Sequence, residues 1–101
     1  MIVSVIYRLE PGQKFDVEYY MNSHIPLVAS RLEPLGLKSA KVLHGIGSPG
    51  GAAAAKLIAQ LEFDSLESFG AAMEKHGGEI LGDIPNFTDS QPSIQFNEQL
   101  A

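Results

Sequence analysis

The sequence predicts one α+β domain in which four strands and two helices follow the order β-α-β-β-α-β. Three observations lead to this prediction. The chain has 101 residues, which is the length of a single domain. Two long stretches repeat apolar residues every three or four positions, as amphipathic helices do. Four shorter stretches alternate in polarity or are rich in β-branched residues, as strands are.

The first strand is predicted at Ile2 to Tyr7, because this β-branched run stops before the turn signal Glu10-Pro11-Gly12. A helix is predicted from Phe15 to Leu35. Asp16 is placed to cap its first turn, and Gly36 is placed to end it in a left-handed conformation.

Pro26 interrupts the pattern of this helix. It lacks a backbone N–H and crowds the carbonyl of Asn22, so we expect a kink and a freed carbonyl within one helix, not two separate helices.

Two strands are predicted in the middle of the chain. Residues 38–46 alternate, and the Gly-rich residues 47–51 form a loop. Residues 52–63 are ambiguous, because four alanines favour a helix. Since Leu57, Ala59, Leu61 and Phe63 alternate with polar residues, we predict a strand there.

A second helix begins after Asp64 or Ser65, either of which can cap it. We expect Gly77-Gly78 to interrupt this helix and residues 79–84 to add a turn. The last strand is predicted at Ser93 to Asn97. This order is the split βαβ arrangement of ferredoxin-like folds, with an antiparallel sheet covered by both helices on one face. The bare second face, half apolar, favours packing against a second copy.

The composition excludes several partners. Twelve acidic and seven basic residues give a net charge of −5, without a Lys/Arg run, which argues against nucleic acid and anionic lipid as partners. No stretch is long enough to span a membrane. The absence of cysteine and of a signal peptide pattern predicts a cytoplasmic protein.

His24 is the main candidate for chemistry. Tyr20, His24 and Val28 share a helix face that points at the predicted sheet. A neutral imidazole in an apolar setting can take a proton or orient a carbonyl, and the phenol of Tyr20 can position it. The alternative is a core histidine bonded to a backbone group, such as the carbonyl that Pro26 frees.

Two separated motifs resemble the EthD family, named for ethyl tert-butyl ether degradation. The first is Phe15-Asp16-x3-Tyr20-x3-His24-x-Pro26-Leu27, and the second is the block from Gly82 to Asp89 followed by Pro92 and a strand. Phe63 to Glu67 agrees as well. The resemblance extends over nearly the whole chain, so residues 1–101 are identified as one EthD-like domain.

The resemblance implies a dimeric α+β barrel whose relatives include monooxygenases, isomerases and cyclases, many without a cofactor. The histidine of the family corresponds to His24. The C-terminal block of the family places Asp83 and Asn86 near the site, where they either tie the loop to the sheet or bind substrate. It places Phe87 either in the core or in the wall of the pocket. We also assign Tyr7 and His44 to the predicted pocket.

Other motifs carry less weight. Gly45-x-Gly47-x-x-Gly50 matches a dinucleotide fingerprint, but a strand is predicted after it and not a helix, so we interpret it as a hairpin loop. His24, His44 and His76 fall on three different elements, and we predict neither a metal site nor a cofactor.

Two functions remain open. The first is an enzyme, oxidoreductase or cofactor-independent isomerase or cyclase, acting on a small apolar oxygenated or aromatic compound with His24 as general base or carbonyl-orienting group. The alternative is a non-catalytic accessory or binding protein that supports an oxygenase or a degradation pathway.

Overall fold

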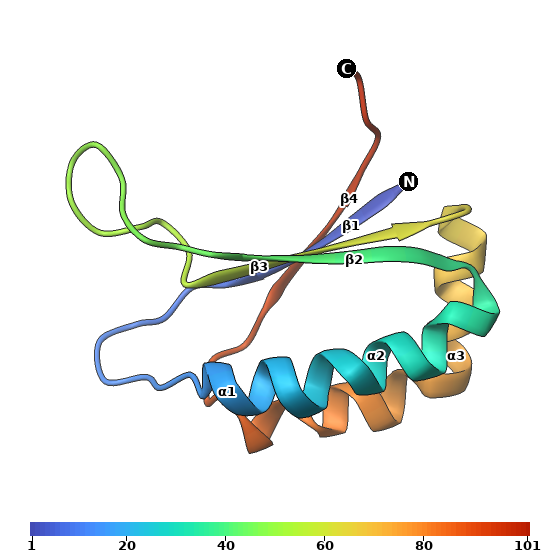
Figure 1. Cartoon of the computed structure of the whole chain (residues 1–101), viewed down its shortest axis with the longest axis horizontal. Helices are drawn as coiled ribbons and strands as arrows, with labels where there is room; N and C mark the ends of the chain where they lie inside the picture. Colours follow the sequence, from blue (N-terminus) through green and yellow to red (C-terminus); the bar gives the residue numbers. More distant parts are fainter.

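The computed structural model describes all 101 residues and confirms the predicted order of elements. Strands β1 (Ile2–Tyr7), β2 (Leu37–His44), β3 (Leu57–Phe63) and β4 (Ser93–Asn97) form one antiparallel sheet in the order β2-β3-β1-β4. Figure 1 shows that the helices lie on one face of the sheet, while the C-terminal residues rise from the other. None of the helices has the length and apolar character that a transmembrane segment needs.

The first helical segment is continuous but changes geometry. It comprises α1 (Val17–Tyr19), a π-helical turn (Tyr20–His24), α2 (Ile25–Leu32) and a 3-10 turn (Glu33–Leu35). The prediction of one helical segment is confirmed, and the irregularity before Pro26 takes the form of the π turn. Pro26 thus lies in the first turn of α2, directly after the π turn, a position at which proline is common.

Both ends of this segment are capped as the sequence predicts. The Oδ1 atom of Asp16 accepts a hydrogen bond of 3.0 Å from the backbone N–H of Tyr19. Gly36 ends the segment with a φ of 114°, a conformation that a side chain disfavours. These two residues set where the first helical segment starts and stops over the sheet.

The second helix differs from the prediction. Helix α3 (Leu66–Gly82) follows the cap residue Ser65, runs through Gly77-Gly78 without a break and is followed by a 3-10 turn (Ile84–Asn86). Packing overrides the low helix propensity of glycine here. Gly77 is buried, and a Cβ atom on it would lie 3.4 Å from the Cε of Met73.

Two further details are corrected. His76 lies inside α3, and not at a helix end as the predicted break implied. Strand β3 begins at Leu57, so the alanine-rich residues 52–56 belong to the connection and not to the strand. Since polar side chains do not alternate with those alanines, no face of that stretch is suited to a half-buried strand.

The core lies between the sheet and the helices and has two parts. Pairing of Val3 with Leu61 and of Tyr7 with Leu57 turns these side chains toward the helices. The larger cluster surrounds Val3, Leu32 and Phe63. The smaller cluster is largely aromatic and consists of Tyr7, Tyr20, Leu57, Ile84 and Phe87. It holds the N-terminal end of the first helical segment against residues 84–87.

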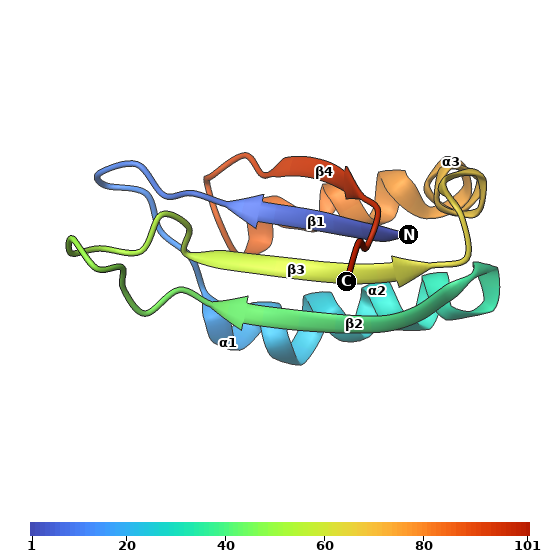
Figure 2. The ribbon, with the colours of Figure 1, turned by 90° about the horizontal axis from the view of Figure 1, so that it is seen from above.

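The opposite face of the sheet is uncovered, as predicted (Figure 2). Register places Ile6, Ile58 and Leu43 side by side on three adjacent strands, so that they form one apolar row across this face. We call these three residues the apolar row. The neighbouring row on the same face is polar and comprises Ser4, Gln60 and Lys41.

Candidate active site

His24 lies on the π turn and is buried, with 4% of its surface exposed. Its Nδ1 atom is 2.9 Å from Oδ2 of Asp83, the residue that follows α3. The contact therefore connects the first helical segment to the end of the second helix. The prediction that the imidazole of His24 faces the protein interior agrees with its position.

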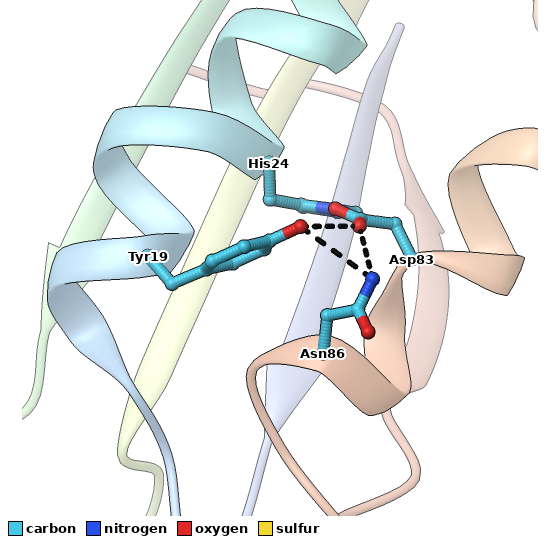
Figure 3. Close-up of polar contacts among 4 residues, drawn as sticks. All are labelled: Tyr19, His24, Asp83 and Asn86. Carbon is cyan, nitrogen blue, oxygen red and sulfur yellow. Dashed lines mark hydrogen bonds and ion pairs between the residues drawn. The ribbon is translucent and has the colours of Figure 1, made fainter.

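Asp83 also accepts two further hydrogen bonds, which Figure 3 shows. The hydroxyl of Tyr19 donates to its Oδ1 atom over 2.7 Å, and Nδ2 of Asn86 donates to the same atom over 2.9 Å. Burial works to raise the pKa of Asp83. The hydrogen bonds from Asn86, Tyr19 and His24 outweigh it, so the pKa lies below its ordinary value of 3.8.

The ionised carboxylate determines the tautomer of the imidazole. Because a carboxylate only accepts hydrogen bonds, Nδ1 of His24 must carry the proton in this contact. In the neutral ring Nε2 is then an acceptor, and no protein group bonds to it. No fully buried side-chain nitrogen or oxygen lacks a partner, so Nε2 is reachable from open space.

Aromatic rings hold the imidazole in place. The ring of Tyr20 stacks on it at a centroid distance of 5.4 Å, and Phe87 contacts it at 4.6 Å. Tyr7 in turn packs edge-on against both Tyr20 and Phe87. The orientation of His24 is thus set by packing on its faces and by Asp83 at one nitrogen.

The open space beside His24 is a cavity of about 50 Å³ between the sheet and the helices. Its lining is almost entirely apolar, and the polar atoms among the lining residues are the His24 ring nitrogens and the hydroxyls of Tyr7 and Tyr20. Burial raises the pKa of Tyr20 to about 12 and, together with the nearby Tyr20, also raises that of Tyr7. Both phenols therefore remain protonated at neutral pH and can donate hydrogen bonds.

The structure brings most of the sequence-predicted site residues together. His24, Tyr20 and Tyr7 line the cavity, Phe87 packs behind the imidazole, and Asp83 and Asn86 belong to the hydrogen-bonded cluster. The imidazole of His24 hydrogen-bonds to the side chain of Asp83. It does not bond to a backbone carbonyl, as the alternative interpretation of a core histidine expected. His44 lies apart, exposed at the end of β2.

Tyr19 is a site residue that the sequence analysis did not identify. In a regular α-helix, positions 19 and 24 do not share a face, so α-helical spacing does not predict Tyr19 as a neighbour of His24. The π turn bonds residues five apart, as Ile25 does to the carbonyl of Tyr20. This wider turn brings Tyr19 and His24 to the same carboxylate. An aromatic residue five positions before His24 was the available signal.

The other motifs lie outside the cluster. The loop from Gly45 to Gly50 connects two strands, as predicted, and no helix N-terminus follows it. Nowhere does the chain gather three or more His, Asp or Glu side chains in an arrangement suited to a metal ion.

Comparison with known proteins concerns the family and the fold of the chain. The EthD domain profile matches residues 13–91, which include His24, Asp83 and Asn86. An EthD-like protein of Ralstonia eutropha JMP134 is similar in structure, with a TM-score of 0.91 and 37% identity over 99% of this chain and 91% of that one. An EthD family protein of Bacillus halodurans C-125 shares the fold, with a TM-score of 0.62 and 22% identity over 97% and 100% of the two chains. No curated protein matches the chain. The profile match and the similarity to the Ralstonia protein show that this chain belongs to the EthD family.

Proposed function

We propose that the chain is a small cytoplasmic enzyme that moves a proton on an uncharged, apolar molecule bearing a carbonyl or phenolic oxygen, without a bound cofactor. His24 acts as the general base. The observation that carries the proposal is the combination of Nδ1 held by ionised Asp83 and Nε2 left free beside an apolar cavity.

The chemistry follows from this geometry. Nε2 takes a proton from an acidic C–H or O–H of the bound molecule, and the electron pair of that bond moves onto the substrate oxygen. Asp83 stabilises the imidazolium that results, because its carboxylate lies at the other ring nitrogen. The imidazolium then returns the proton at a different atom, which gives an isomerisation. In a ring closure, the enolate carbon first attacks a second carbonyl carbon of the same molecule, the C=O π bond breaks, and the imidazolium returns the proton to the alkoxide that forms.

The phenols of Tyr7 and Tyr20 support the same reaction. Both line the cavity, and no protein acceptor takes up either hydroxyl. As neutral donors they are suited to the substrate oxygen on which negative charge develops. An anionic substrate is disfavoured, because the apolar lining offers no cation to pair with it.

A homodimer is part of the proposal. The apolar row Ile6, Ile58 and Leu43 lies on a sheet face that no element of the chain covers. A chain of 101 residues buries a limited share of its surface alone. Two copies joined through these faces would gain the missing burial and leave the cavity, on the other side of the sheet, accessible.

The test is proton exchange in heavy water. We expect the protein to accelerate deuterium uptake at the carbons beside the carbonyl in at least one of a panel of small ketones such as cyclohexanone, measured by proton NMR. His24→Gln keeps a polar side chain without a base, and we expect exchange to fall by about 10²- to 10⁴-fold. His44→Gln is the matched control and should leave the rate unchanged, since His44 is exposed and does not line the cavity.

Exchange that survives His24→Gln within a few-fold would contradict the assignment of His24 as base. Native mass spectrometry of the purified protein complements the test, because it measures the mass of the assembly and of any retained small molecule. An empty dimer that accelerates no exchange but binds an oxygenase would favour the accessory function.

A further inference from the structure

A second hollow lies next to the cavity beside His24. Its volume is about 360 Å³, and residues 88–91 give it a polar wall. The two hollows share four lining residues. Leu81 lies at the end of α3, Ile84 in the 3-10 turn that follows, Pro92 directly before β4 and Ile94 in β4. The outer, polar hollow therefore adjoins the inner, apolar cavity at this shared rim.

The polar wall of the outer hollow is tied down. The hydroxyl of Thr88 donates to the carbonyl of Lys14 over 2.6 Å, and that of Ser90 donates to the carbonyl of Arg8 over 3.0 Å. The backbone N–H of Lys14 donates to Asp89 over 2.9 Å. Three bonds to residues 8–14 hold this segment, so widening of the passage must come from side chains on the rim.

Two rim side chains have room to move. Leu81 is 48% exposed and Ile94 is 47% exposed, although both line the inner cavity. Ile84, by contrast, is buried. A cavity of about 50 Å³ holds only a few water molecules. A ligand with a ring must therefore displace side chains, and Leu81 and Ile94 can rotate toward solvent at little cost.

We propose that ligands reach His24 from the outer hollow by passing between Leu81 and Ile94, and that these two side chains select ligands by width. The proposal rests on the proposed function in that the ligand is the uncharged apolar molecule described there. Larger side chains at these positions narrow the passage, and smaller ones admit broader rings.

The test uses diethylpyrocarbonate, a small uncharged reagent that acylates unprotonated imidazole nitrogens. Peptide mass spectrometry follows the rate at each histidine separately, so exposed His44 is an internal reference in every sample. We expect His24 to react more slowly than His44 in the wild-type protein. Leu81→Trp should slow the reaction of His24 about tenfold without affecting His44, and Leu81→Ala should accelerate it.

Leu66→Trp is the matched control. Leu66 is a leucine on the same helix with 47% exposure, but it lies at the other end and lines neither hollow. It should leave the His24 rate unchanged. Ile94→Trp, on a different element, should reproduce the slowing; slowing by Leu81→Trp alone would indicate a distorted helix end and overturn the proposal.

An unchanged His24 rate in Leu81→Trp, or a His24 that stays unreactive even in Leu81→Ala, would also overturn the proposal. The assay requires no turnover. The acylation rates can therefore support the passage even if the exchange experiment rejects His24 as a base. They can likewise reject the passage even if the exchange experiment supports His24 as a base.

Discussion

At the scale of single residues, the carboxylate of Asp83 organises the site because it contacts three hydrogen-bonding residues from two helical segments. Tyr19 comes from the first helical segment, His24 from its π turn and Asn86 from the 3-10 turn after α3. Hydrogen bonds to a charged group are among the stronger ones. The lowered pKa of Asp83 means that folding favours its ionised form.

Tyr19→Phe tests this organisation. Removal of one donor should lower the free energy of unfolding at neutral pH, measured by urea denaturation at fixed protein concentration. Because the folded-state pKa of Asp83 is lowered, its contribution is present above its ordinary value of 3.8 and is lost as the pH falls through the folded-state pKa. The difference between wild type and variant should therefore shrink in acid.

Tyr20→Phe is the neighbouring control. Its hydroxyl has no protein acceptor, so we expect a small, pH-independent change in unfolding free energy. If the Tyr19→Phe difference stayed constant as the pH fell through the folded-state pKa of Asp83, the Tyr19 hydroxyl would not be stabilising the charge on Asp83.

At the scale of elements, two glycines with different environments show what a helix interior and a helix end each require. Gly78 lies within α3, and a Cβ atom on it would meet no atom within 4 Å. Gly36 has a φ of 114°, and a Cβ atom there would lie 3.2 Å from Cβ of Ser68. The first position is an ordinary helical site, whereas the second is a left-handed stop.

The two glycines predict opposite changes. Gly78→Ala should raise the free energy of unfolding by about 0.5–1 kcal/mol, because alanine has the higher helix propensity and the smaller unfolded-state entropy. Gly36→Ala should lower it by about 1 kcal/mol or more, because the left-handed conformation strains a side chain. Both are measured by thermal or urea unfolding, and a destabilising Gly78→Ala would mean that α3 is interrupted in solution.

At the scale of the whole molecule, the two sides of the sheet have separate roles. The helices enclose the cavity on one side, and the apolar row Ile6, Ile58 and Leu43 lies on the other. Association through the second side would leave the shared rim of the two hollows free.

Ile58→Asp tests the proposed dimer. A carboxylate at the centre of the apolar row would have to be buried unpaired, so we expect the variant to sediment as a monomer at concentrations where the wild type is a dimer. Leu66→Asp, an exposed leucine on α3, should leave the assembly unchanged. A wild type that sediments as a monomer at all concentrations would contradict the proposed association.

The sequence alone was sufficient for the order of elements, the caps at Asp16 and Gly36 and the inward position of His24. These features depend on local periodicity and turn chemistry, which can be read directly from the residue types and their spacing. The continuity of α3 through Gly77-Gly78 could not be read in this way, because tertiary packing stabilises that helix.

Only the tertiary structure decided the partners of His24. Asp83 lies 59 positions away, and whether it ties its own loop or holds the imidazole depends on how α3 ends beside the π turn. The place of Tyr19 depends on that same turn, which an α-helical spacing does not predict. The sequence thus determined that the side chain of His24 faces the interior. The folded chain determined which ring nitrogen of His24 carries the proton, because long-range contacts and not local patterns set its hydrogen bonds.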